Sequence, residues 1–199
     1  MTTTQVVSFL LFAVVAAGSP GPSNTMLTTV GAQAGILKGL SSLFGQVIGM
    51  GLIMFLVPFG LGTLVLQYPF LRWALKSGGA TFLLWLSWKI ATSSTRIDSQ
   101  PDRNPVGFLG AALFQWVNPK AWLIVSAAAG TFLSSGAGSA VVQAASLAGL
   151  FVVAALPSCF PWLAFGAAVP RILHTRRRLR IFNFTMGVLL ALSIVLIVR

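Results

Sequence analysis

The chain has 199 residues, of which 56% are hydrophobic and only 8% are charged. A soluble domain carries roughly 25% charged residues, so this chain lacks the polar side chains that would cover a surface in water. The 13 Lys and Arg against 2 acids give a net charge of +11, but these cations lie mostly between apolar stretches, which indicates a membrane protein and disfavours a nucleic-acid partner.

Six apolar segments follow one another along the chain, each long enough for the roughly 20 residues that a membrane-spanning helix needs. They predict an all-α membrane protein with transmembrane helices over 5–27, 40–66, 70–91, 107–133, 140–167 and 181–198. No Lys or Arg precedes Lys38, so the first segment lacks the positive region of a secretory signal and we expect it to be retained.

One hydrophilic stretch, residues 93–105, divides the chain and carries both acids, Asp98 and Asp102. It predicts a solvated loop inside a single transmembrane domain, 1–199, with one half over about 1–92 and the other over about 106–199. Each half then contains three of the six predicted helices.

The positive charges predict an orientation. The loops after the first, third and fifth predicted helices hold most of them: Lys38, Lys89, Arg96, Arg103, Arg171, Arg176, Arg177, Arg178 and Arg180. The opposite side holds three, which are Arg72, Lys76 and Arg199. By the positive-inside rule, we expect the first set in the cytoplasm and both termini in the periplasm.

Two of the predicted helices contain breaks. SPGPSN, residues 19–24, interrupts the first helix, and WVNPKAW, residues 116–122, interrupts the fourth. Proline removes a backbone donor and clashes with the preceding turn of a helix. Because each half contains three helices, the second half has the opposite orientation in the membrane. The two breaks then lie at matching positions and predict inverted repeats whose first and fourth helices are broken at a transporter binding site. The alternative is that both breaks are structural kinks.

A helix that restarts after a break presents free N–H groups and a partial positive charge, which favour an anion. Ser23, Asn24 and Asn118 are candidate caps for the two restarts. Lys120 lies about 18–20 Å into its predicted helix, and no predicted helix contains a carboxylate that would neutralise it. It either awaits an anionic group on a substrate or binds backbone carbonyls and snorkels.

Other polar residues in apolar surroundings, Gln46, Gln115 and Asn183, either join the site or form hydrogen bonds between helices. The predicted substrate-binding residues are Pro20, Gly21, Pro22, Ser23, Asn24, Gln46, Gln115, Asn118, Pro119 and Lys120. Cys159, the single cysteine, predicts buried packing, and without a Cys/His cluster we expect no metal and no cofactor.

Glycines at four-residue spacing predict close contacts between helices. The pairs are Gly35 with Gly39 and Gly45 with Gly49. Such pairs act within a chain or between chains, so a homodimer is possible.

At these residues the sequence resembles the lysine-exporter (LysE/RhtB) family of amino-acid efflux proteins. The matching pieces cover nearly the whole chain: PGPSN, GQVIG, YPFLRWALKSGGATFLLWLSWKI, FQWVNPKAW and RRRLRIFNFTMGVLL. The resemblance implies a six-helix, multi-pass protein of the bacterial inner membrane that exports amino acids or related metabolites by antiport, with alternating access and a proton or sodium as coupling ion. Many family members carry Asn or Asp directly after PGP, where this chain has Ser23 and then Asn24. The coupling ion and the substrate therefore stay open.

Other function classes fit the residues less well. An intramembrane enzyme needs a nucleophile with a base, or metal ligands, and the one histidine, His174, lies in a basic run. A divalent-cation exporter remains the alternative, although hard cations prefer carboxylate ligands that the predicted helices lack. A neutral amino acid is favoured as substrate because it brings its own carboxylate to Lys120, whereas a basic side chain would need a further anion.

Overall fold

A computed structural model describes residues 1–60, 67–92, 106–133, 139–173, 175–192 and 194. Within these ranges the chain is helical and has no strand: α1 (Thr3–Gly18), α2 (Pro22–Leu56), the 3-10 helix η1 (Val57–Phe59), α4 (Pro69–Ala91), α5 (Phe108–Val117), α6 (Pro119–Phe132), α7 (Ala140–Ile172) and α8 (Arg176–Leu192). The all-α prediction is confirmed. Asp98, Asp102 and His174 lie outside the described residues.

Both predicted breaks are present in the backbone. α1 ends at Gly18 and α2 begins at Pro22, so three residues separate the two helices. A single residue, Asn118, separates α5 from α6, which begins at Pro119. Each helix therefore restarts with a proline in its first position, where the missing N–H costs no helical hydrogen bond.

α2 reverses its direction at Gly35, within the predicted connection between the first two helices, although the sequence pattern does not identify Gly35 as the turning residue. Gly35 has φ 74° and ψ −177°, a conformation that favours glycine. The side chains of Asn24 and Gln46 are hydrogen-bonded at 3.3 Å, whereas in one straight helix they would lie about 33 Å apart at 1.5 Å per residue. The first predicted helix therefore continues past 27 to this turn, and the second begins before 40.

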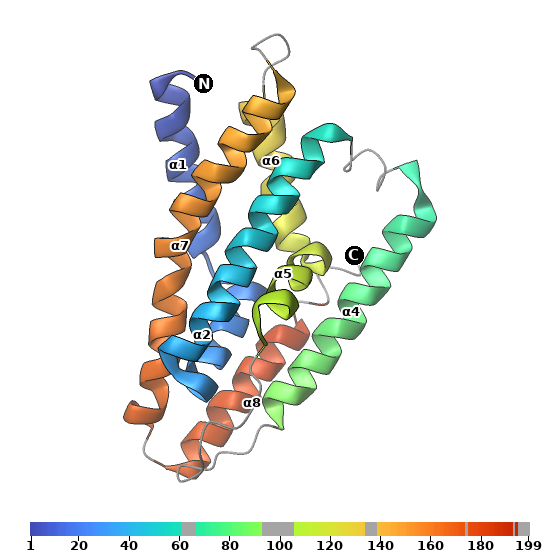
Figure 1. The fold of residues 1–199 in the computed structure, drawn as a ribbon. Helices are drawn as coiled ribbons and strands as arrows, with labels where there is room; N and C mark the ends of the chain where they lie inside the picture. Colours follow the sequence, from blue (N-terminus) through green and yellow to red (C-terminus); the bar gives the residue numbers. More distant parts are fainter. Residues whose placement is uncertain (61–66, 93–105, 134–138, 174, 193, 195–199) are drawn as a thin grey trace.

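The helices form one elongated bundle (Figure 1). α2 packs mainly along α7 and α5, α1 packs against α7, and α4 packs against α8. Two described helical stretches, Pro22–Phe59 and Ala140–Ile172, are long and apolar enough to cross a membrane. Because the first of them contains the Gly35 reversal, its length does not represent one crossing.

Glycines permit close helix packing inside the chain. A Cβ at Gly45 would lie 2.1 Å from Phe108 O and one at Gly49 would lie 2.6 Å from Ala112 O, so this pair seats α2 against the backbone of α5. The contact is intramolecular, so the pair gives no support to a homodimer, which stays a prediction.

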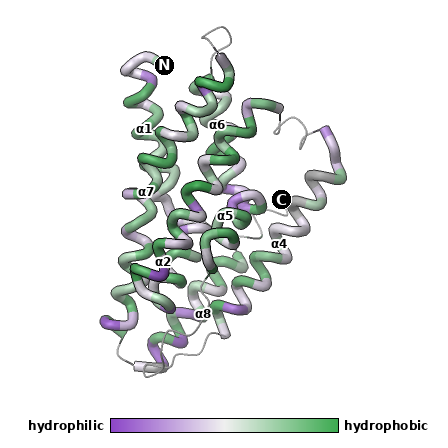
Figure 2. The backbone as a smooth tube through the Cα atoms, viewed as in Figure 1, coloured by the Kyte–Doolittle hydropathy of each residue, from purple (hydrophilic) through white to green (hydrophobic). Residues whose placement is uncertain are grey.

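Large apolar side chains cover much of the outer surface. Hydrophobic residues dominate most of the helices in Figure 2, and Leu11, Val15 and Val153 are 65%, 70% and 66% exposed. Apolar patches of this extent mark a surface that meets something other than water. The outer face is therefore compatible with lipid.

Candidate functional site

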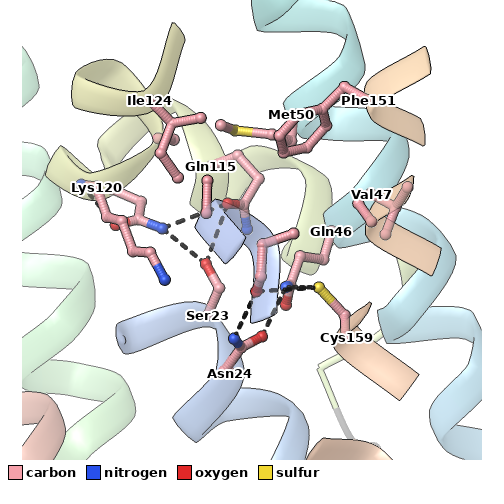
Figure 3. A pocket seen from close by; sticks show the side chains of 15 residues that line it. Ser23, Asn24, Gln46, Val47, Met50, Gln115, Lys120, Ile124, Phe151 and Cys159 are labelled. Atoms are coloured by element: carbon pink, nitrogen blue, oxygen red, sulfur yellow. Dashed lines mark hydrogen bonds between the residues drawn. The ribbon is translucent and has the colours of Figure 1, made fainter. Parts of the chain in front are cut away.

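The two helix breaks meet at one cavity (Figure 3). Its walls come from α1, α2, α5, α6 and α7, and the residues that line it are Ala16, Ala17, Ser23, Asn24, Gln46, Val47, Met50, Gln115, Asn118, Lys120, Ala121, Ile124, Phe151, Ala155 and Cys159. Six of these were predicted from the sequence as site residues: Ser23, Asn24, Gln46, Gln115, Asn118 and Lys120.

Ser23, Gln115 and Asn118 form a buried hydrogen-bonded cluster that joins the two breaks. Asn118 Nδ2 donates to Ser23 Oγ at 2.7 Å and to Gln115 Oε1 at 3.3 Å. Ser23 Oγ donates to Gln115 Oε1 at 3.0 Å, and Gln115 Nε2 donates to Ala111 O at 3.2 Å. Each of these side chains already has partners inside the protein, so the cluster ties the start of α2 to the α5–α6 break.

A second set of polar residues lies beside the first break. Asn24 Nδ2 donates to Ala17 O at 2.8 Å and to Ser19 O at 2.9 Å, which satisfies carbonyls freed where α1 ends. Gln46 Nε2 donates to Asn24 Oδ1 at 3.3 Å and to Cys159 Sγ at 3.5 Å. The second half of α2 and α7 are thereby connected to the break.

Lys120 reaches across to the first break from the first turn of α6. Its Nζ donates to Ser19 O at 2.6 Å and to Pro20 O at 3.4 Å. Gly21 makes room for this approach, because a Cβ at that position would lie 2.9 Å from Lys120 Cδ. The sequence left two roles open for Lys120, and the structure places its ammonium on backbone carbonyls at the edge of the cavity.

The two restarted helices differ at their N-termini. Asn118 caps α6, as predicted: its Oδ1 accepts from Lys120 N at 3.1 Å, and its carbonyl accepts from Ala121 N at 3.0 Å. At α2 the prediction of Ser23 or Asn24 as the cap is wrong. Pro22 occupies the first helical position, so Gly21 is the N-cap and no side chain caps the helix.

The cavity is narrow. Its empty space measures about 350 Å³ with the open mouth included, but the centre of a water molecule can occupy only about 30 Å³ of it. A water needs on the order of 10–15 Å³ by that measure, so the cavity holds about two waters. An amino acid enters only if the surrounding helices move apart.

Comparison with known proteins identifies the family. The family model described as LysE type translocator matches residues 14–198. The chain belongs to this family. It is 31% identical over 137 residues to the cysteine/O-acetylserine efflux protein of Escherichia coli (strain K12), an alignment that covers 67% of this chain and 68% of that protein. The protein of the same name from Shigella sonnei (strain Ss046) matches to the same extent. No solved structure matches the chain.

In this translocator, four predicted site residues contribute through the backbone. Pro20, Gly21, Pro22 and Pro119 form the breaks, and none of their side chains lines the cavity. Asn183 is buried on α8 and is also absent from the cavity wall.

Sequence reasoning missed two contributions from α7. Cys159 is buried as predicted, yet it also lines the cavity and contacts Ala17 O at 3.6 Å. Trp162 Nε1 donates to Gly18 O at 2.9 Å and so satisfies another carbonyl at the end of α1. Neither residue carries a local signal, because both act on a segment more than 140 residues away along the chain.

Proposed function

We propose that this chain is a multi-pass transporter of the bacterial inner membrane that exports a neutral amino acid such as cysteine or O-acetylserine. The observation that carries the proposal is the polar cavity in which two broken helices of a LysE type translocator meet. The relatives named cysteine/O-acetylserine efflux proteins support the choice of substrate.

The proposed path through the membrane has six crossings in two inverted halves. α1 with residues 22–34 forms the first crossing, residues 36–56 the second and α4 the third. α5 with α6, then α7, then α8 form the other three. The end of α4, the end of α7 and the start of α8 lie together at the lower end of the molecule in Figure 1, and the N-terminus lies at the upper end.

Positive charges support the proposal that this lower end faces the cytoplasm. Lys89 lies in the last turn of α4 and Arg171 in the last turn of α7, and Arg177 and Arg178 lie in the first turn of α8. Cations are retained on the cytoplasmic side of a membrane. The N-terminus is then periplasmic.

The chemistry of the cavity suits a zwitterion better than a cationic amino acid. Lys120 is the one cation among the described residues that line the cavity, and no Asp or Glu lines it. The carboxylate of an amino acid supplies the missing negative charge, and the N–H groups of Ser23 and Asn24, at an α2 N-terminus without a capping side chain, add favourable dipoles. A lysine or arginine side chain would lack an anionic partner here.

Antiport with alternating access completes the proposal, with a proton or a sodium ion as the coupling ion. Support comes from the small cavity, because a substrate larger than the available space requires helix movement for entry and for release. The interrupted helices and the Gly35 turn provide places at which such movement can begin.

Amino-acid release from dipeptide-fed cells tests the proposal. Cells that carry the protein should release cysteine, O-acetylserine or another neutral amino acid faster than cells with an empty vector. Lysine and arginine should be released at the rate of the empty-vector control. Strong export of lysine or arginine alone, or no export of any amino acid at a verified abundance in the membrane, would overturn it.

A further inference from the structure

The orientation of the Asn24 amide follows from its surroundings. Its Nδ2 end lies 2.8 Å from Ala17 O and 2.9 Å from Ser19 O. Both neighbours are carbonyl oxygens, which accept hydrogen bonds and do not donate them, so the NH₂ end must face them. Asn24 Oδ1 therefore points the other way and needs a donor.

The Asn24 orientation in turn determines how Gln46 is placed. Gln46 Nε2 is the donor that lies 3.3 Å from Asn24 Oδ1, and it also lies 3.5 Å from Cys159 Sγ. If the Gln46 amide were reversed, its Oε1 would face Asn24 Oδ1, and two acceptors would meet without a donor between them. Gln46 Oε1 is consequently the end without a neighbour: it has no hydrogen-bond partner among the described residues, although the side chain is only 5% exposed.

A buried acceptor without a partner is unusual, because most buried polar atoms are paired. Gln115 provides the contrast inside the same cavity. Its Oε1 accepts from Ser23 and from Asn118, and its Nε2 donates to Ala111 O. The cavity wall therefore contains one glutamine whose two ends are occupied and one, Gln46, whose acceptor oxygen is buried without a partner among the described residues (Figure 3).

We propose that Gln46 Oε1 accepts a hydrogen bond from the protonated amino group of the substrate, and that it makes this group a requirement for transport. The inference rests on the proposed function and adds the group that recognises the ammonium. The carbonyls of Ser19 and Pro20 accept from Lys120. Among the described residues that line the cavity, Gln46 Oε1 is the one buried side-chain oxygen or nitrogen atom without a partner. The neighbouring Val47 and Phe151 side chains carry no acceptor, and the thioether of Met50 is only a weak one.

Recognition by a neutral acceptor has a chemical consequence. An amide oxygen binds an ammonium group without adding a fixed negative charge, so it does not retain a bare cation as a carboxylate would. The site then selects compounds that carry both a carboxylate, for Lys120, and a hydrogen-bond donor beside it. An acid that lacks the amino group would leave Gln46 Oε1 unpaired.

Two analogues and two matched variants test this assignment in proteoliposomes under reducing conditions. 3-Mercaptopropionate is cysteine without its amino group, so competition against labelled cysteine exchange measures what the amino group contributes. The parent should prefer cysteine by about 10- to 150-fold, the range for one hydrogen bond to a charged group. Gln46→Met should bring this preference close to unity. Gln115→Met, the control, removes a buried glutamine of the same size and should weaken both ligands while keeping their ratio.

The ratio separates recognition from structural damage. Gln46→Met also removes the donor to Asn24 Oδ1, but that loss affects both ligands alike. Gln46→Glu provides a second variant: it keeps an oxygen acceptor and should keep or increase the preference for cysteine. A preference that survives in Gln46→Met, or one lost in Gln46→Glu, would overturn the inference while leaving amino-acid export intact. A parent protein that exchanges no amino acid would instead refute the proposed function.

Discussion

Replacing Lys120 with methionine distinguishes the two roles that its position allows. Its ammonium contacts Ser19 O at 2.6 Å and Pro20 O at 3.4 Å, and it also lines the cavity. An ammonium carries three N–H groups, so two carbonyls leave one donor for a substrate carboxylate. Lys120→Met removes the charge and keeps a flexible side chain of similar length.

The effect on folding should be small because two contributions oppose each other. The shorter bond, from Lys120 to Ser19 O, has a charged donor, and such bonds contribute about 1.5–3 kcal/mol. Removing a cation from within a membrane helix relieves about 2.5–3.5 kcal/mol on insertion scales. We therefore expect Lys120→Met to reach the membrane in amounts similar to the parent.

The effect on substrate binding should be large. Loss of one hydrogen bond between charged partners weakens affinity by about 10- to 150-fold. Cysteine exchange in proteoliposomes measures this, and cysteamine, which is cysteine without its carboxylate, serves as the matched ligand. Lys120→Met should weaken cysteine and should not weaken cysteamine, a cation whose repulsion from Lys120 is removed. Lys120→Arg keeps the charge but presents a planar fork, so it should restore binding only in part.

A structural role gives a different result. If Lys120 serves only the carbonyls of the break, Lys120→Met will leave the cysteine affinity at the parent value. That result would refute the assignment of Lys120 to the substrate carboxylate.

Three further predictions concern packing, capping and coupling. Gly166→Ala should prevent correct folding, because its Cβ would lie 2.0 Å from Thr28 O. Gly149→Ala on the same helix should be tolerated, because its Cβ would have no atom within 4 Å. Thermal unfolding of both variants checks this. Asn118→Ala should cost more than the ~1 kcal/mol of a lost α6 cap, because its buried hydrogen bonds to Ser23 and Gln115 are lost too, and a lower melting temperature measures this. The double variant Asp98→Asn, Asp102→Asn should keep the pH dependence of export. If the double variant lost this pH dependence, the two acids would carry the coupling proton.

The breaks were predictable because proline and glycine act on their own local backbone. A proline disfavours the interior of a helix, although Pro157 and Pro161 lie inside α7. The prolines at the two breaks stand beside Gly or Asn, and Asn118 before Pro119 is a local capping signal that the structure confirms. The same local reasoning misplaced the cap of α2. Ser23 is a good capping residue by type, but Pro22 takes the first helical position and moves the cap to Gly21.

The partners of the polar residues were not predictable, because they depend on where the chain returns. The pairing of Asn24 with Gln46 requires the reversal at Gly35, and the sequence offers Gly35 only as one of several spaced glycines. Lys120 contacts carbonyls that lie about a hundred residues earlier, at separations of 100 and 101 positions. Local patterns identified the polar residues, and the tertiary fold decides which of them still have an unused donor or acceptor.

The two breaks differ in how many of their polar groups are already paired within the protein. At the second break, Asn118 caps α6 and holds Ser23 and Gln115, so its hydrogen-bonding capacity is used within the protein. The first break starts a helix that no side chain caps, and beside it lies Gln46 Oε1, which has no hydrogen-bond partner in the part of the chain that the structure describes. Buried polar groups that are fully paired make a site rigid, whereas an unpaired group is stabilised by a ligand that completes it. We therefore propose that the α5–α6 break mainly supports the cavity, and that Gln46 beside the α1–α2 break acts with Lys120 to recognise what enters it.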